Sequence, residues 1–350
     1  MAREFGFAII GCGLIADFHA RAISELPGAK LVVVADKFEE PARRLARKFG
    51  CDWTCDWRDL LKRDDVRVVN VTTPSGTHAD FAVAAARAKK HVICEKPLDI
   101  TLPRVDRMIR AARENGVKLA GIFGSRFSEA AKTVKKAVDQ GRFGRLTMGN
   151  AYVKWWRSQE YYDKGGWKGT AKLDGGGALM TQSIHAIDLL LWLMGPVRTV
   201  AAFKATLAHE RIEVEDTAVA SVCFANGALG GVFGATSAWP GFLKRIEISG
   251  DRGSAIFEEE DILFWDFLDK RPEDELVREK FAHGRSGAGG AADPAAISHE
   301  PHKRQIADFL EALRTGREPL VNGPEARKAV ELILAIYRSA QKGRFVKLQG

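Results

Sequence analysis

The sequence predicts an α/β domain with a doubly wound parallel sheet, followed by an α+β domain with a large, mostly antiparallel open sheet. Three observations support this prediction. Short β-branched runs alternate with helical stretches in the first third of the chain, the pattern changes near residue 124, and strand-like runs joined by turn signals then dominate. A chain of 350 residues is too long for one ordinary core, so we expect two domains, 1–124 and 125–350.

The first third of the chain is predicted to be a Rossmann-type domain. Alternating strands and helices with short connections imply a parallel sheet, right-handed crossovers and helices on both faces. The predicted strands are 5–10, 31–35, 66–72, 91–94 and 117–122. The predicted helices are 16–26, 39–49, 77–88 and 103–114.

The rest of the chain carries more strands than helices, with turn signals such as Asn226-Gly227 between them. The predicted strands are 146–157, 199–207, 217–224, 229–237, 244–249 and 254–257. The predicted helices are 128–140, 177–194, 302–314 and 324–341. The Gly/Ala-rich segment 284–296 is expected to be a loop, and the terminal helix is a candidate to pack back on the first domain.

The composition predicts a cytoplasmic protein with no nucleic-acid, membrane or metal partner. No apolar run approaches the roughly 20 residues of a membrane span, and the N-terminus has no signal-peptide pattern. The net charge is +8, but the basic residues are interleaved with acidic ones and do not form a patch. The cysteines are scattered, and Cys51 with Cys55 lacks a second pair for a zinc site, so we expect reduced thiols.

A glycine fingerprint between the first strand and the first helix predicts a dinucleotide site. Gly11 permits a tight turn, Gly13 lets the backbone approach a pyrophosphate, and Ala16 allows close helix–strand packing. Asp36 ends the second strand, where a carboxylate accepts hydrogen bonds from the ribose hydroxyls and repels a 2′-phosphate. This favours NAD over NADP, although Lys37 is adjacent. The alternative is a glycine turn that binds no cofactor.

Two further polar clusters follow strand ends, the edge where open α/β sheets bind ligands. They are Thr72–His78 after the third strand and Glu95-Lys96-Pro97 after the fourth. A lysine near a nicotinamide can hold a substrate oxygen and exchange its proton as hydride moves, if its pKa is lowered. The alternative for Lys96 is a solvated surface lysine.

A glycine run at 175–177 opens the predicted helix 177–194. Helical spacing places Thr181, His185 and Asp188 on one stripe, with Gln182 beside it. A polar stripe on an apolar helix needs partners or a ligand. We therefore predict that His185 is catalytic, and the alternative is a satisfied core histidine.

The polar loop before that helix is rich in aromatic side chains that can stack on sugar rings. These are Trp155, Trp156, Tyr161, Tyr162 and Trp167. Arg157 or Lys168 could meet a carboxylate or a phosphate. The alternative is that the rings belong to the core or to an oligomer interface.

Taken in this order, the motifs resemble those of the Gfo/Idh/MocA family over essentially the whole chain. They are Gly11-x-Gly13-x-x-Ala16, Thr73-Pro74 with His78, Glu95-Lys96-Pro97, and the glycine-led helix with His185. The resemblance implies NAD(P), a hydride step at a carbon bearing a hydroxyl, and dimers or tetramers packed through the C-terminal sheet. It also implies that Lys96 is the catalytic lysine, that His185 shuttles or positions the hydroxyl proton, and that Arg126 lies near the cofactor.

One departure narrows the resemblance. Many members have an aspartate four residues before the histidine, where this chain has Thr181, so Lys96 and His185 are left to carry the proton transfer. The pattern looks most like the branch that oxidises UDP-linked N-acetylglucosaminuronate at C3, where that aspartate is also replaced.

These inferences define the expected activity and site. We expect NAD-dependent hydride transfer between nicotinamide and a secondary alcohol or ketone of a sugar, sugar acid or glycoside. The alternatives are a lyase, epimerase or glycosidase that recycles NAD, and a non-catalytic dinucleotide sensor. The predicted cofactor-binding residues are Gly11, Gly13, Leu14, Ile15, Asp36, Lys37, Thr73, Pro74, Ser75, His78, Glu95, Lys96 and Arg126. The predicted substrate-binding residues are Lys96, Trp155, Arg157, Tyr161, Trp167, Lys168, Thr181, Gln182 and His185.

Overall fold

The computed structural model describes residues 4–164, 166–281 and 298–348. The predicted loop at 284–296 lies outside the described residues. The chain divides into two compact units. Unit 1 comprises Met1–Gly124 and Ser298–Arg327, and unit 2 comprises Ser125–Ile297 and Lys328–Gly350.

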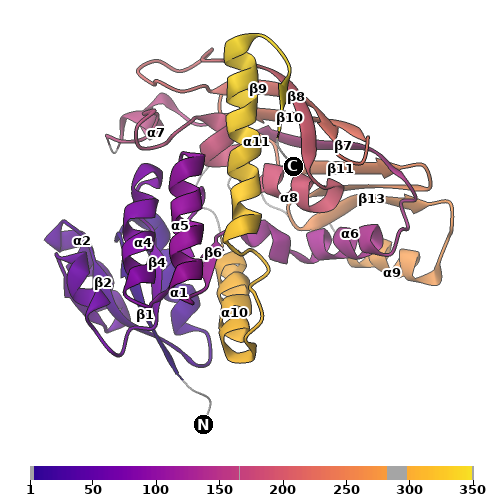
Figure 1. Ribbon diagram of the computed structural model, residues 1–350. Helices are drawn as coiled ribbons and strands as arrows, with labels where there is room; N and C mark the ends of the chain where they lie inside the picture. The colour runs from indigo at the N-terminus through magenta and orange to yellow at the C-terminus, as the bar shows by residue number, and fades with distance from the viewer. Residues whose placement is uncertain (1–3, 165, 282–297, 349–350) are drawn as a thin grey trace. The chain divides into compact units, whose positions relative to one another are not determined.

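Unit 1 is built on a six-stranded parallel sheet in the order β3-β2-β1-β4-β5-β6. Figure 1 labels β1, β2, β4 and β6 of this sheet. The strand order reverses between β1 and β4, which confirms the predicted doubly wound sheet. The strands are β1 (Phe5–Ile10), β2 (Ala29–Ala35), β3 (Asp52–Thr54), β4 (Val68–Val71), β5 (His91–Cys94) and β6 (Leu119–Gly121). The short β3 was not predicted, because its side chains are largely exposed and form no apolar run.

Helices cover this sheet, and one of them comes from the far end of the chain. The helices are α1 (Leu14–Ser24), α2 (Glu39–Phe49), α3 (Trp57–Leu61), α4 (His78–Arg87), α5 (Leu102–Glu114) and α10 (Glu300–Thr315). Strand β1 directs Phe7 and Ile9 into a core shared with α1, α2 and α10, and α10 adds Phe309 and Leu310 to it. Helices α4 and α5 pack side by side (Figure 1).

Unit 2 contains an eight-stranded sheet in the order β13-β12-β11-β7-β10-β9-β8-β14. Only β7 and β10 pair in parallel among its described strands, which confirms the predicted mostly antiparallel sheet. The strands are β7 (Leu146–Lys154), β8 (Val197–Ala205), β9 (Thr217–Phe224), β10 (Leu229–Ala235), β11 (Arg245–Gly250), β12 (Gly253–Glu258), β13 (Asp261–Phe267) and β14 (Val346–Lys347). The helices are α6 (Glu129–Asp139), α7 (Gln159–Asp163), α8 (Ile184–Met194) and α9 (Pro272–Phe281), and α11 (Gly323–Lys342) starts in unit 1 and ends in unit 2.

The two faces of the unit 2 sheet differ. On one face α8 packs so closely that a Cβ on Gly149 would lie 2.6 Å from the Met194 side chain. The other face, here called the open face, carries apolar side chains aligned across the strands by their register. The open face is defined by Met148, Tyr152, Phe203, Val219, Leu229 and Phe233. Within the described ranges, none of the helices has the length and apolar character needed to cross a membrane.

Candidate active site

The predicted fingerprint forms the turn between β1 and α1. Gly11 has a φ of +96°, and a Cβ there would lie 2.9 Å from the Thr72 carbonyl group, so the turn requires glycine. A Cβ on Gly13 would meet nothing within 4 Å. Protein packing therefore does not require glycine at Gly13, and the open space there fits a close-lying cofactor. Helix α1 begins at Leu14, and no side chain caps its first N–H groups, so these amides can bind a phosphate.

Asp36 follows β2 and lies against the fingerprint turn. One carboxylate oxygen accepts a hydrogen bond from the Cys12 amide at 2.8 Å, and the other accepts from the Phe38 amide at 2.9 Å. These bonds fix the carboxylate beside the turn, where it can meet ribose hydroxyls. The Lys37 ammonium lies 4.6 Å from the centre of the Phe38 ring on the exposed surface.

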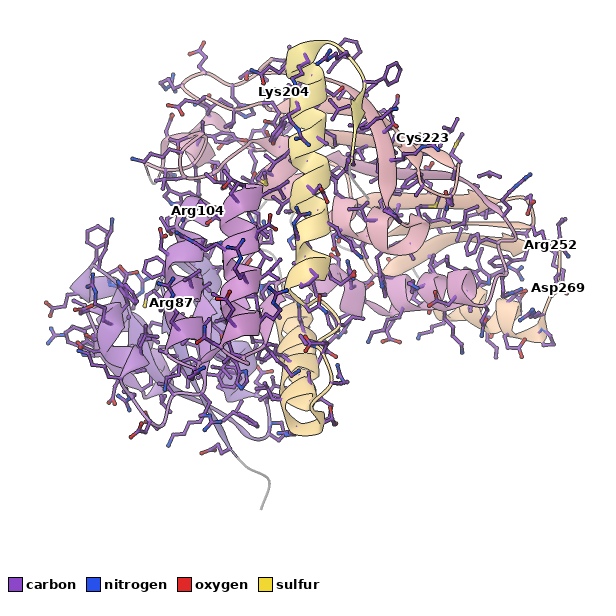
Figure 2. All side chains as sticks on the ribbon, in the orientation of Figure 1. Arg87, Arg104, Lys204, Cys223, Arg252 and Asp269 are labelled. Atoms are coloured by element: carbon purple, nitrogen blue, oxygen red, sulfur yellow. The ribbon has the colours of Figure 1, made fainter. Side chains whose placement is uncertain are left out.

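The segment after β4 is joined to the segment after β5 by the buried ring of His78. Its Nδ1 lies 2.8 Å from the Pro97 carbonyl oxygen, and its Nε2 lies 2.7 Å from the Thr73 carbonyl oxygen. Both ring nitrogens are thus engaged by the two loops. Arg104 on α5, labelled in Figure 2, supports the same segment. It donates to the Gly76 carbonyl at 3.1 Å. These bonds hold in place one segment of unit 1, between β4 and α4. This segment contains the predicted residues Thr73, Pro74, Ser75 and His78.

Glu95 and Lys96 directly follow β5. The Glu95 carboxylate is buried, and its Oε2 accepts a hydrogen bond from the Lys96 amide at 3.0 Å. Its other oxygen faces histidines of the core. Glu95 thus has internal partners for both oxygens, while the neighbouring Lys96 is partly exposed.

In unit 2 the glycine run at 175–177 is demanded by close packing. A Cβ on Gly176 would lie 2.2 Å from the Tyr337 hydroxyl, and one on Gly177 would lie 1.7 Å from the Glu215 carbonyl oxygen. The Glu215 carboxylate accepts hydrogen bonds from the Gly177 and Leu179 amides, each at 3.0 Å, and from the Tyr337 hydroxyl at 2.8 Å. Burial, together with Glu215, raises the pKa of Tyr337 well above its ordinary value. These contacts fix the start of the helix that carries His185.

The prediction of one regular helix over 177–194 is wrong in its first turns. Residues Ala178–Ser183 form a π-helix, and the α-helix begins at Ile184. Two side chains bond back to backbone carbonyls of this segment: Thr181 Oγ1 to Gly177 at 2.8 Å and Ser183 Oγ to Ala178 at 2.9 Å. Side-chain hydrogen bonds to backbone carbonyls compete with the regular helical bonds, and they accompany the wider turn of the π-helix here. Thr181 and His185 remain partly exposed, whereas Asp188 is buried.

Asp188 forms a buried ion pair with Arg126. The guanidinium donates Nε to Oδ2 at 2.8 Å and Nη2 to Oδ1 at 2.7 Å, and each side chain is 1% exposed. The Arg126 guanidinium also lies 5.4 Å from the Trp192 ring centre. The structure therefore assigns Arg126 an anchoring contact on α8, one turn after His185.

A polar and aromatic cluster surrounds Arg157. This buried guanidinium donates to the Gln182 side-chain oxygen at 2.9 Å and lies 5.1 Å from the Trp155 ring centre. Gln182 Nε2 donates to the Tyr161 hydroxyl at 3.3 Å, and the Lys168 ammonium lies 4.0 Å from the Tyr161 ring centre. The cluster thus unites most of the predicted substrate-binding residues of unit 2.

Burial shifts the pKa values of two side chains in this cluster. Burial lowers the pKa of Lys168; Asp174 opposes that effect, and Arg157 adds to it. Burial also raises the pKa of Tyr161, so its hydroxyl stays protonated. Gln182 Nε2 also donates to the Thr181 hydroxyl at 3.3 Å, which links the cluster to the helix. Trp167 is partly exposed beside Lys168.

His209, which no sequence motif identifies, supports Arg157. His209 Nε2 bonds the Arg157 carbonyl oxygen at 2.8 Å, and its Nδ1 lies 3.0 Å from the Asp216 carboxylate. Asp216 in turn accepts the amides of three consecutive residues, 207–209. No short motif signals this arrangement, because His209 lies in a loop 52 positions from Arg157.

All five cysteines are free thiols. Burial raises the pKa of Cys12 to about 12 and that of Cys51 to about 11, with nearby aspartates adding to the effect. Both thiols therefore stay protonated and unreactive at neutral pH.

Two family models match the chain. Residues 5–123 match an oxidoreductase family with an NAD-binding Rossmann fold, and residues 131–256 match the GFO/IDH/MocA C-terminal domain. Together the two models span residues 5–256, apart from 124–130.

Named relatives agree with these matches. The crystal structure of the WlbA dehydrogenase from Bordetella pertussis, in complex with NADH and UDP-GlcNAcA, has a TM-score of 0.88 and 33% identity, covering 99% of this chain and 100% of that chain. Myo-inositol 2-dehydrogenase of Thermotoga maritima is 29% identical over 97% of this chain and 98% of its own length. Levoglucosan dehydrogenase of Pseudarthrobacter phenanthrenivorans is 30% identical over 74% of each chain.

Proposed function

Because the chain belongs to the Gfo/Idh/MocA family of NAD-binding oxidoreductases, we propose that it oxidises a secondary hydroxyl of an anionic sugar. The predicted family, cofactor and enzyme class are confirmed by this membership and by its dehydrogenase relatives. C3 of a UDP-linked N-acetylglucosaminuronate is the first candidate substrate position. The WlbA enzyme, bound to UDP-GlcNAcA in its crystal structure, supports this choice.

The observation that carries the proposal is the pair of cations around Tyr161. Arg157 and Lys168 both lie close to this ring, at 5.6 Å and 4.0 Å from its centre. A guanidinium and an ammonium gathered beside aromatic rings suit a carboxylate or phosphate attached to a sugar. A neutral polyol such as an inositol carries no anionic group for these cations to attract.

We assign the proton chemistry to Lys96 and His185. NAD, when bound, accepts the hydride from the carbon that bears the hydroxyl. The hydroxyl proton must leave with it, and an amine or an imidazole can take that proton. Thr181 has no ionisable carboxyl group, and its hydroxyl bonds the Gly177 carbonyl. It therefore orients its neighbours rather than accepting the proton.

The test is NADH formation from NAD, followed by absorbance, with UDP-N-acetylglucosaminuronate, UDP-N-acetylglucosamine and myo-inositol as substrates. We expect the uronate to be preferred and Lys96→Met to lower the rate of NADH formation by roughly 100-fold or more, leaving a residual rate that single-turnover experiments can measure. Lys168→Gln should raise KM for the uronate roughly tenfold or more, as for a lost charge-assisted hydrogen bond. The matched control is Lys172→Gln, an exposed lysine in the same loop.

Two results would contradict the proposal. Equal efficiency with the neutral sugar nucleotide would remove the need for an anionic group, and so would an equal effect of Lys168→Gln on all substrates. No signal with any sugar, with NAD retained on the purified protein, would favour the alternative in which NAD is recycled within the cycle.

We further propose that a second copy of the chain covers the open face. Phe203 is 83% exposed and Leu229 is 56% exposed there, and such apolar patches mark interaction surfaces. Phe203→Lys should convert a dimer or tetramer to smaller species in light-scattering chromatography. An unchanged mass would contradict this interface. The unpaired thiols fit a reducing compartment, so we place the enzyme in the cytoplasm.

A further inference from the structure

A buried polar network in unit 1 joins four separate segments of the chain. Glu95 Oε1 lies 3.0 Å from Nε2 of His19 on α1 and 3.1 Å from Nε2 of His302 on α10. Asn70 on β4 adds Nδ2, 2.7 Å from Nδ1 of His19. All four residues are at most 9% exposed. Only Glu95 belongs to a motif that the sequence identifies.

The hydrogen-bond partners define the tautomers. The amide of Asn70 donates to His19 Nδ1, so the proton of His19 lies on Nε2 and points to Glu95. His302 Nε2 must also carry a proton, because a carboxylate oxygen only accepts. Burial lowers the pKa of His19, against the opposing effect of Glu95, so its ring is neutral. Burial raises the pKa of Glu95, but the two histidines outweigh it and hold that pKa well below its ordinary value.

The carboxylate therefore has its two oxygens engaged on opposite sides. Two N–H groups hold Oε1, and Oε2 accepts the Lys96 amide at 3.0 Å. The orientation that the histidines impose on the carboxylate is passed to the main chain at Lys96, immediately after β5 ends at Cys94. A change in this orientation would move the Cα of Lys96.

We propose that His19 and His302 are positioning residues that act on Lys96 through the Glu95 carboxylate. The inference rests on the proposed catalytic role of Lys96. Its consequence is that α10, 207 positions away in the sequence, belongs to the catalytic machinery of unit 1. Misplacement of a catalytic group by about 1 Å can cost roughly 100-fold in rate. The network thus affects turnover more than cofactor or substrate binding.

The same three side chains could instead hold a metal ion, because their ligand atoms lie within 4.8 Å of one another. The tautomers argue against this arrangement. Both Nε2 atoms point protons at Glu95, and a metal ligand needs a free lone pair there. We therefore assign a hydrogen-bond network and make metal content one outcome of the test.

The experiment compares His302→Leu with His302→Gln in the full-length enzyme. A glutamine amide can donate from about the position of Nε2, whereas leucine cannot. We expect His302→Leu to lower kcat roughly 10- to 100-fold, with the NADH dissociation constant and the substrate KM within about twofold of wild type. His302→Gln should recover most of kcat. Loss of kcat that glutamine does not recover, or a matching loss of NADH affinity, would overturn the proposal.

A double-mutant cycle with Lys96→Met shows whether the effect passes through Lys96. In the Lys96→Met background, His302→Leu should cause no further loss in single-turnover rate, whereas an additive loss contradicts the inference. Near-wild-type activity of Lys96→Met alone would instead refute the proposed function, and the inference with it. If the wild-type protein contains one equivalent of zinc and His302→Leu contains none, the three side chains form a metal site and the proposed hydrogen-bond network is wrong.

Discussion

Replacing Asp188 with asparagine should destabilise unit 2 more than any exposed charge removal in that unit. The substitution preserves the size of the side chain but leaves the Arg126 guanidinium without its carboxylate, and each side chain of the pair is only 1% exposed. Removing one partner of a buried, doubly hydrogen-bonded pair costs about 3–5 kcal/mol, because the remaining charge stays desolvated. For a unit of this size, each kcal/mol lowers the melting temperature by roughly 2–4 °C.

We therefore expect Asp188→Asn to melt at least about 6 °C below wild type, the lower end of that range, when unfolding is followed by calorimetry. The double variant Arg126→Met/Asp188→Leu should be less destabilised than Asp188→Asn, because no unpaired charge remains. The matched control is Asp163→Asn, whose partner Arg211 is exposed, and its melting temperature should not change measurably.

Two results would refute this reasoning. One is a melting temperature of Asp188→Asn equal to that of Asp163→Asn, and the other is a double variant no more stable than the single one. The NADH dissociation constant of the double variant also tests the predicted role of Arg126. An unchanged constant would limit Arg126 to anchoring α8, and a large increase would support contact with the cofactor.

Four further variants test other parts of the site. Gly177→Ala should lower the free energy of unfolding by about 1–3 kcal/mol or more, because its Cβ would lie 1.7 Å from the Glu215 carbonyl oxygen. Gly13→Ala places its Cβ in open space, so it should keep wild-type thermal stability but weaken NADH binding measured by fluorescence. Asp36→Ser should narrow the preference for NAD over NADP in steady-state assays, since it removes the carboxylate that repels a 2′-phosphate, and an unchanged cofactor ratio would contradict that role. The Lys168 side chain loses its proton as pH rises through its lowered pKa. The KM for an anionic substrate should therefore begin to rise at a lower pH than it would for a lysine with an ordinary pKa. In Lys168→Gln the dependence of KM on pH should be flatter.

Local signals made the first half of the site predictable. Gly11 carries a geometric requirement in the turn, Gly13 lies at the fixed spacing of the motif, and Asp36 follows a strand that the apolar pattern already marks. The strand-end position of Lys96 follows from the same alternation of strands and helices. In each case the residues that define the feature are close in sequence, so the pattern can be read without knowing which distant segment packs against it.

The parts that could not be predicted depend on distant partners. Nothing near His302 signals that it bonds Glu95, and nothing near His209 signals that it holds the Arg157 carbonyl. The π-helix at Ala178–Ser183 keeps the apolar pattern of an ordinary helix, and its extra residue per turn is accompanied by side-chain bonds such as that of Ser183 to Ala178. Arg126 stays predicted to lie near the cofactor, and its local motif does not indicate that its carboxylate partner lies 62 positions away.

The interrupted course of unit 1 has a consequence for synthesis on the ribosome. The strands and helices of Met1–Gly124 are translated first, but the core side of β1 and α1 is completed by Ile306, Phe309 and Leu310 of α10. Until those residues emerge, the nascent domain keeps an apolar surface that attracts chaperones and invites aggregation. Unit 1 is therefore completed only after Ser125–Ile297 of unit 2 has been translated, and a ribosome that stalls within that segment leaves the cell with an incomplete nucleotide-binding fold.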